Sequence, residues 1–439
     1  MNPKMRRSIS LLAAGSAFVL ISACGSGGSS PAASTAPTAQ GPVGEPTSPV
    51  TISFASWVGQ EKGMKALYQK FHAAHPNITV EFQDVPAEEI EQKLTTQIAG
   101  GNPPDAAYVD AGTVATFASR DALTNLDPYI ARSTIVDAKD YAPAFKAFTQ
   151  VDGGMHGLPF DGESTALFYR KDRFADAGIT APPKTWDEFQ ADAAKLTDPA
   201  NKKYGFEVFA PESDYYWYPW LWQNGGKLVS DDEKSVGFDT PEARQAAEFY
   251  VNLTKYSPKD YLNSNSYDGR VAFANGQVGM YMAGAWFAGT LQDEYPKIDD
   301  KWAAAPLPQG AAGCATTIAG DALVVFGKSA KQDAAWKWIE FLSDKENMAE
   351  WTYKSTGTLL PPRLSLIDSP DLVKEKPVLA TFADQMKCGV NYNIANKAWP
   401  KVTDELKKQL GNAMYGDQTA DQAIDNTVAA GNRLLARGR

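Results

Sequence analysis

The stretch Val50-Thr51-Ile52-Ser53-Phe54 alternates apolar and polar side chains, which is typical of a β-strand with one buried face. Apolar residues at helical spacing follow it and predict a helix near 64–71. The pattern repeats as a strand at 78–82, a helix at 90–98 and a strand at 106–109. Strands that alternate with helices are joined by crossover connections and form a mainly parallel sheet. The sequence therefore predicts an α/β fold.

Polar loops follow two of these strands. Residues 57–62 follow the first strand, and residues 110–113 follow the third. Ligands of open α/β sheets bind outside the carboxyl ends of the strands, so we expect both loops to border one crevice. Gln60, Glu61 and Asp110 are the candidate ligand-binding side chains on these loops. A surface or helix-capping role is the alternative for each of them.

Residues 1–23 have the composition of a secretory signal peptide, with basic residues before the short apolar run Leu11–Ile21. The run ends in Leu20-Ile21-Ser22-Ala23-Cys24, which resembles the bacterial lipobox. We therefore expect Cys24 to be acylated and to hold the mature chain at the outer face of a membrane. The alternative is an ordinary signal peptide with an incidental cysteine. Residues 24–49 are rich in Gly, Ser, Pro, Ala and Thr, which predicts a flexible tether.

The net charge excludes some classes of partner, and the cysteines predict a disulfide. Removal of residues 1–23, which carry three basic and no acidic side chains, changes the formal net charge from −10 to −13. Such an acidic chain is not suited to nucleic acid or to anionic lipid head groups. With Cys24 acylated, Cys314 and Cys388 remain, and two thiols in an exported protein usually form a disulfide. Two separate buried thiols are the alternative.

Short motifs follow one another from about Thr51 to the C-terminus. They include Phe71-His72-Ala73-Ala74-His75-Pro76-Asn77-Ile78, Phe168-Tyr169-Arg170-Lys171-Asp172, Pro183-Lys184-Thr185-Trp186-Asp187-Glu188-Phe189, Gly276-Gln277-Val278-Gly279-Met280 and Gly284-Ala285-Trp286. Each motif alone is weakly specific, but their order and spacing together are strongly specific. On these motifs the chain resembles the extracellular solute-binding lipoproteins of ABC importers, in the carbohydrate-binding branch that includes maltose-binding protein.

The resemblance implies a periplasmic-binding-protein-like fold of two α/β lobes, a hinge and a central ligand cleft. By analogy, residues 50–163 and 317–362 form one lobe, and residues 164–316 and 363–439 form the other. Closure of the lobes around the ligand is the motion that the family implies.

The resemblance also implies which residues bind the sugar. Aromatic rings suit the C–H faces of a sugar, whereas carboxylates, amides and Arg suit its hydroxyls. The residues implied are Asp161, Glu163, Tyr215, Tyr216, Trp217, Gly284, Trp286, Arg363 and Trp399, with Trp220 and Trp222 assigned to the core. The alternatives are core packing for Trp286 and Trp399, a solvated loop acid for Glu163 and an interlobe ion pair for Arg363.

One position departs from the family pattern. Many relatives have Gly-Gly where this chain has Gly320-Asp321. A carboxylate at this position is suited to bind a sugar hydroxyl or to cap a loop, and we favour a ligand-binding role for Asp321.

The family implies a carbohydrate ligand, which we expect to be a di- or oligosaccharide. It also implies a membrane permease with two transmembrane subunits and a cytoplasmic ATPase as the partner. We expect a monomer without cofactor, metal or nucleic acid. A secreted glycoside-acting enzyme is the alternative, because paired acids such as Asp161 and Glu163 also occur in glycosidases.

Overall fold

The computed structural model describes residues 41–259, 268–354, 357–394, 396 and 398–437. The proposed lipidation site Cys24 and the predicted signal peptide lie outside these residues. Residues 41–49, expected to be part of a flexible tether, pack on the folded chain. Val43 is buried, and Glu45 contacts His75 at 2.9 Å and Lys337 at 3.1 Å. The flexible tether stays a prediction, and Val43 and Glu45 attach its residues 41–49 to the folded chain.

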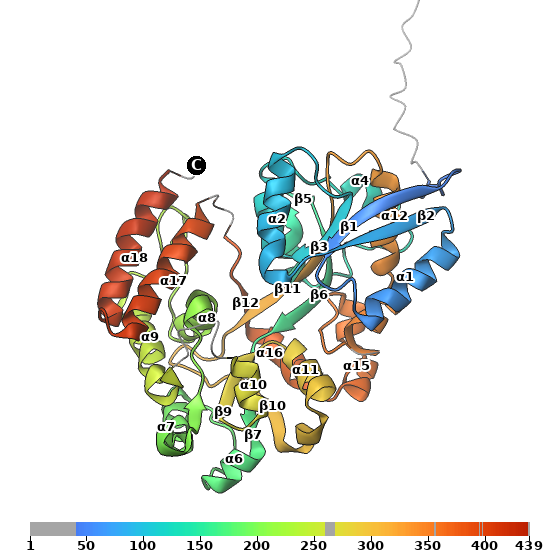
Figure 1. The fold of residues 1–439 in the computed structure, drawn as a ribbon. Coiled ribbons are helices and arrows are strands. Elements are labelled where there is room, and N and C mark those ends of the chain that lie inside the picture. Colours follow the sequence, from blue (N-terminus) through green and yellow to red (C-terminus); the bar gives the residue numbers. More distant parts are fainter. Residues whose placement is uncertain (1–40, 260–267, 355–356, 395, 397, 438–439) are drawn as a thin grey trace, which may run out of the picture. The chain divides into compact units, whose positions relative to one another are not determined.

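Among the described residues, six strands form the first sheet, in the order β12-β11-β3-β1-β2 with β6 on the other edge of β11 (Figure 1). β1 (Val50–Ser56) runs parallel to both β2 (Ile78–Asp84) and β3 (Ala106–Asp110), which confirms the predicted parallel arrangement. The long strand β11 (Thr316–Val325) is antiparallel to β3 and to β6 (Leu158–Ser164). The sheet is thus mixed at the point where β11 enters it.

The second sheet has the order β10-β7-β9-β8. Its strands are β7 (Ala166–Arg170), β8 (Tyr204–Phe206), β9 (Val278–Ala283) and β10 (Trp302–Ala305). Only Thr165 separates β6 of the first sheet from β7 of the second, so the chain passes directly from one sheet to the other. A small hairpin, β4 (Gln150–Val151) and β5 (Gly154–Met155), stands apart from both sheets.

Helices surround the sheets, and none in the described part of the chain is long and apolar enough to cross a membrane. The helices before β8 are α1 (Lys62–Ala74), α2 (Ala87–Ala99), α3 (Thr113–Ala118), α4 (Asp127–Ile130), α5 (Pro143–Thr149), α6 (Lys171–Asp176) and α7 (Trp186–Leu196). Those after β8 are α8 (Ser213–Gln223), α9 (Pro241–Asn252), α10 (Gly269–Ala274), α11 (Trp286–Glu294), α12 (Gln332–Leu342), α13 (Lys345–Ala349), α14 (Leu364–Ile367), α15 (Pro370–Glu375), α16 (Leu379–Gln385), α17 (Trp399–Tyr415) and α18 (Ala420–Leu435).

The aromatic run 215–222 lies in helix α8. The helix contains Pro219 and is apolar on most of its circumference. It therefore packs against α9 and α17 and contributes to the hydrophobic core around the second sheet. Trp217 and Trp220 are both fully buried there. Because α8 is buried on nearly all sides, the spacing of its rings could not show which of them face a ligand.

The C-terminal part of the chain returns to the first sheet before it completes the second lobe. β12 (Gly389–Asn391) pairs in parallel with residues 316–318 of β11, although the family analogy assigned 363–439 to the second lobe. After β12, the chain forms α17 and α18, which lie side by side with α8 and α9 nearby (Figure 1). The exact lobe boundaries remain a proposal.

A disulfide joins Cys314 and Cys388, as predicted, with their Cα atoms 5.8 Å apart. Cys314 lies two residues before β11, and Cys388 directly precedes β12. The bridge therefore fastens the starting points of two strands that pair with each other, and it holds the segment after β12 near the sheet.

We predict that replacement of both cysteines by alanine destabilises the fold. The two cysteines are 74 residues apart in sequence. In the chain-entropy model, a disulfide that closes a loop of this size stabilises the folded state by about 4 kcal/mol. The midpoint of thermal unfolding, measured by calorimetry, should fall by several degrees, and each single variant should lose as much as the double variant. Two free thiols in the denatured, non-reduced wild-type protein would contradict the assignment.

Candidate functional site

Three aspartates form a row across three neighbouring strands of the first sheet. The register pairs Asp321 of β11 with Asp110 of β3 on one side and with Asp161 of β6 on the other. Directly paired residues project from the same face of a sheet, so all three carboxyl groups lie on one face. Glu163 follows two residues after Asp161 in β6 and lies on that face as well.

Aromatic residues hold two of these carboxyl groups in place. The Tyr108 hydroxyl lies 2.8 Å from Asp161 Oδ2 and 2.6 Å from Asp321 Oδ2, and Trp351 Nε1 donates to Asp161 Oδ2 at 2.6 Å. The ring of Trp351 also stacks on Phe160, the residue that bulges from β6 where its register with β11 shifts. One hydroxyl proton cannot serve both aspartates, so the second contact requires a proton from a carboxyl group.

Glu163 lies against the end of strand β9. A Cβ atom at Gly284 would come within 1.6 Å of Glu163 Oε2 and within 2.8 Å of the Trp286 ring, so only glycine leaves room for both. The result is a carboxyl group and an indole ring next to each other at the start of helix α11.

These side chains line a cavity of about 870 Å³, which lies within the range typical of ligand pockets. The cavity is bordered by the first sheet, by helix α10 and by helix α11. Of the residues predicted from the sequence it brings together Glu61, Asp110, Asp161, Glu163, Trp286 and Asp321. Asp321 is part of a central strand, so the loop-capping alternative for it is wrong. Glu61 makes no side-chain cap to helix α1.

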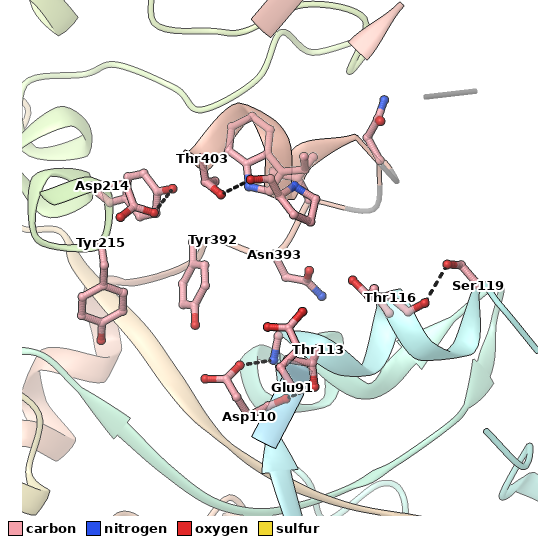
Figure 2. A pocket seen from close by; sticks show the side chains of 17 residues that line it. Glu91, Asp110, Thr113, Thr116, Ser119, Asp214, Tyr215, Tyr392, Asn393 and Thr403 are labelled. Atoms are coloured by element: carbon pink, nitrogen blue, oxygen red, sulfur yellow. Dashed lines mark hydrogen bonds between the residues drawn. The ribbon is translucent and has the colours of Figure 1, made fainter. Parts of the chain in front are cut away.

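A second, smaller cavity of about 220 Å³ shares Asp110 with the first. Figure 2 shows the rings of Tyr215 and Tyr392 facing it from one side, and Asp110 and Glu91 from the other. Trp399, the first residue of α17, also lines it, although only 6% of this residue is exposed. The Tyr215 hydroxyl is 3.3 Å from Thr165 Oγ1, at the passage between the two sheets.

Four predicted site residues lie elsewhere. Gln60 donates to Asp84 at the surface, and Trp217 packs against Phe238 in the core. Tyr216 is half-buried and borders neither cavity. Arg363 is 2% exposed and donates to Asp140 at 2.8 Å and to the carbonyl of Ser343 at 2.8 Å. Arg363 is therefore a buried structural side chain, because its hydrogen-bonding groups are occupied within the fold.

The lining also includes residues that were not predicted, among them Trp57, Tyr108, Arg270 and Trp351. Trp57 belongs to the polar loop at 57–62, where sequence reasoning considered only the polar side chains. Tyr108 belongs to a strand that reads as core. No motif in the sequence around Trp351 indicates a site residue, because its hydrogen-bond partner Asp161 is 190 residues away.

The carboxyl groups of the cavity are poorly solvated, and this raises their pKa values. Burial, followed by the negative charges of Asp161 and Asp110, raises the pKa of Glu163 to about 8. Burial raises the pKa of Asp110 to about 6 against a lowering hydrogen bond from the Gly112 N–H. Burial and the neighbouring Asp161 raise the pKa of Asp321 well above its ordinary value. At neutral pH, part of this cluster therefore carries protons.

These shifts predict that the empty protein loses stability as the pH rises. A carboxyl group with a raised pKa in the folded state favours folding while it is protonated, and this contribution is lost as the pH passes through the folded-state pKa. Between pH 6 and pH 9, the thermal unfolding midpoint of the wild type should fall. The midpoint of Glu163→Gln should fall by a smaller amount, with a difference of at least about 3 °C between the two proteins by circular dichroism. The exposed Asp231→Asn variant is the control, and identical pH profiles for all three proteins would refute the expectation.

Comparison with known proteins places this architecture among binding proteins. The family described as bacterial extracellular solute-binding protein matches residues 55–349. A putative binding protein of Brucella abortus strain 2308 is 30% identical over 380 residues, which cover 84% of this chain and 88% of that protein. A maltotriose-binding protein of Pyrococcus abyssi is 25% identical over 331 residues, covering 74% of this chain and 68% of that protein.

Solved structures with related sequences have the same fold. An ABC transporter solute-binding protein of Thermotoga lettingae, bound with α-D-tagatose, is 26% identical with a TM-score of 0.80, covering 89% of this chain and 100% of that chain. The sugar-binding protein MalE of Xanthomonas citri is 28% identical with a TM-score of 0.74, covering 88% of this chain and 98% of that chain. The two-lobed α/β fold predicted from the sequence is thereby confirmed. The chain belongs to the family of bacterial extracellular solute-binding proteins.

Proposed function

We propose that this protein captures a carbohydrate, either a di- or an oligosaccharide, in the larger cavity and delivers it to an ABC importer. The observation that carries the proposal is the combination of Trp286 with the carboxyl groups of Asp110, Asp161, Glu163 and Asp321 around one cavity. Indole rings match the C–H face of a sugar, and carboxyl groups match its hydroxyls.

The related proteins support this choice of ligand. One relative is named for maltotriose, and one solved neighbour holds a monosaccharide, α-D-tagatose. The smaller cavity adds the rings of Tyr215, Tyr392 and Trp399 beyond Asp110, which would suit a further sugar unit. Selectivity would arise because buried acceptors stay unpaired with a sugar of the wrong shape.

Delivery requires a partner in the membrane. The family implies a permease with two transmembrane subunits and a cytoplasmic ATPase, and a hinge motion that closes the lobes over the ligand. Binding that favours the closed form would let the permease distinguish the loaded protein from the empty one. We propose that acylated Cys24 keeps the protein next to this permease.

The enzyme alternative makes a separate prediction. Asp161 and Glu163 would have to act as an acid and a nucleophile or base toward a glycosidic bond. Oδ2 of Asp161 is already engaged by Tyr108 and Trp351, which suits an acceptor of fixed orientation more than a group that must exchange protons. Incubation with oligosaccharides, followed by chromatography, should show no products while the melting temperature rises; products would contradict the binding function.

Trp286→Ala should greatly weaken sugar binding while the fold persists. Aromatic anchors of binding sites typically contribute 2 kcal/mol or more, so we expect an affinity loss of at least about 30-fold by titration calorimetry. Trp222→Ala, which removes a half-buried ring that borders neither cavity, is the matched control. Near-native affinity in a folded Trp286→Ala protein would show that this ring only packs against Phe287.

Cys24→Ser should abolish attachment to the membrane. Without the thiol there is no site for the lipid, so the protein should appear in the medium or keep its signal peptide. Cell fractionation with immunoblotting measures this, and the exposed Asp231→Asn variant serves as a control that leaves all three cysteines intact. Normal cleavage with unchanged membrane retention of Cys24→Ser would argue against lipidation.

A further inference from the structure

The larger cavity carries an excess of negative groups. Among the described residues, seven carboxyl side chains line it: Asp110, Asp161, Glu163 and Asp321 in the sheet, and the exposed Glu61, Asp293 and Glu294 around them. In the same part of the chain, only Lys62 and Arg270 bring positive charge to the lining. Arg270 is already occupied, because its Nε and Nη2 atoms donate to the two oxygens of Asp268 at 3.0 and 2.8 Å. The protein thus provides little positive charge to balance the acids of the cavity.

Two of these acids have a buried oxygen without a hydrogen-bond partner among the described residues, Asp161 Oδ1 and Glu163 Oε2. Asp161 is only 1% exposed, so water has little access to it. A buried carboxyl oxygen without a donor is costly, which implies that donors from a ligand complete the site. An ammonium group has three donors and no acceptor, so it can donate to both unpartnered oxygens at once, whereas a single hydroxyl has only one proton to donate.

The excess charge does not point to a metal ion. In the part of the chain that the structure describes, no group of three His, Cys, Asp or Glu side chains is placed to hold one. The aspartates are spread in a row across β3, β11 and β6, and Tyr108 and Trp351 occupy Asp161 Oδ2. An organic cation, whose charge sits on a larger framework, fits a row of acceptors better.

The aromatic residues are consistent with a cation. The Trp286 ring lies next to the Glu163 carboxyl group across Gly284, and Trp57 and Trp351 also line the cavity. A protonated amine placed over an indole is attracted by the ring quadrupole, and the indole equally accepts the C–H face of a sugar. Glu163 and Trp286 together can therefore bind a positive nitrogen and the ring that carries it.

We propose, on the basis of the proposed carbohydrate-binding function, that the ligand is a basic saccharide or aminopolyol. Its protonated nitrogen binds Glu163 and Asp161 beside Trp286. Binding of such a cation ionises the Glu163 carboxyl group, and the released proton passes to the buffer. A raised pKa of Glu163 in the empty protein, caused by burial and by the charges of Asp161 and Asp110, supports this coupling.

The test compares saccharides that differ only at one nitrogen. Three sets serve as probes: glucose, glucosamine and N-acetylglucosamine; galactose, galactosamine and N-acetylgalactosamine; and cellobiose, chitobiose with free amines and N,N′-diacetylchitobiose. Maltose and maltotriose are included as neutral α-linked references. Calorimetry at pH 6.5, where the amines and Glu163 are both protonated before binding, in phosphate and in ACES gives the affinity and, from the difference in enthalpy, the number of protons released.

We expect a free-amine probe to bind at least tenfold more tightly than its hydroxyl and acetamido counterparts, with release of protons. If neutral sugars bind as well as or better than the amines, including the case in which only the maltose references bind, the amine proposal is overturned while the carbohydrate function stands. If no saccharide binds in any form, both the proposed function and this inference fail.

Two variants test whether Glu163 binds the protonated nitrogen of the ligand. Glu163→Gln keeps the shape of the side chain but cannot ionise, so it should lower the preference for the amine over the hydroxyl form at least tenfold and abolish proton release. Asp231→Asn, at an exposed position outside both cavities, is the control and should retain the wild-type preference. An unchanged amine preference in a folded Glu163→Gln protein would overturn the placement of the nitrogen at Glu163.

Discussion

The pairing register of β11 is the constraint on which the candidate site depends. Because Asp321 lies opposite both Asp110 and Asp161, three strands that are remote in sequence deliver their carboxyl groups to one face. A shift of one residue would turn Asp321 to the other face of the sheet and Ala322 toward the cavity. Such a row of acids is unfavourable in an empty protein, and Tyr108 and Trp351 limit the cost by hydrogen bonding to it.

The surrounding structure keeps this register while it brings a second wall to the cavity. Thr165 alone connects β6 to β7, so the strand that carries Asp161 and Glu163 leads directly into the second sheet, whose strand β9 ends beside Trp286. The Cys314–Cys388 bridge fastens the parallel pair of β11 and β12, and the segment after β12 supplies Tyr392 to the smaller cavity. The connection from β6 to β7 and the segment after β12 therefore join the two parts of the fold and also position ligand-facing side chains.

Sequence reasoning succeeded where the signal was local and failed where a partner was distant. The strands at 50–54 and 106–109, and the acids at their ends, follow from alternation and from the geometry of parallel sheets. Arg363 was misassigned because its acceptor Asp140 lies 223 residues away, and motif resemblance says nothing of such a contact. Trp217 was misassigned because α8 is apolar on most sides, so periodicity could not separate ligand-facing rings from core rings.

The central claim is that a saccharide binds between Trp286 and the row of carboxyl groups. A crystal structure of the protein with the saccharide that most raises its melting temperature tests this claim most directly. The account predicts a sugar ring in van der Waals contact with the Trp286 indole and hydrogen-bonded to at least two of Asp110, Asp161, Glu163 and Asp321. A saccharide bound at another place, with the cavity beside Trp286 containing only water, would contradict it.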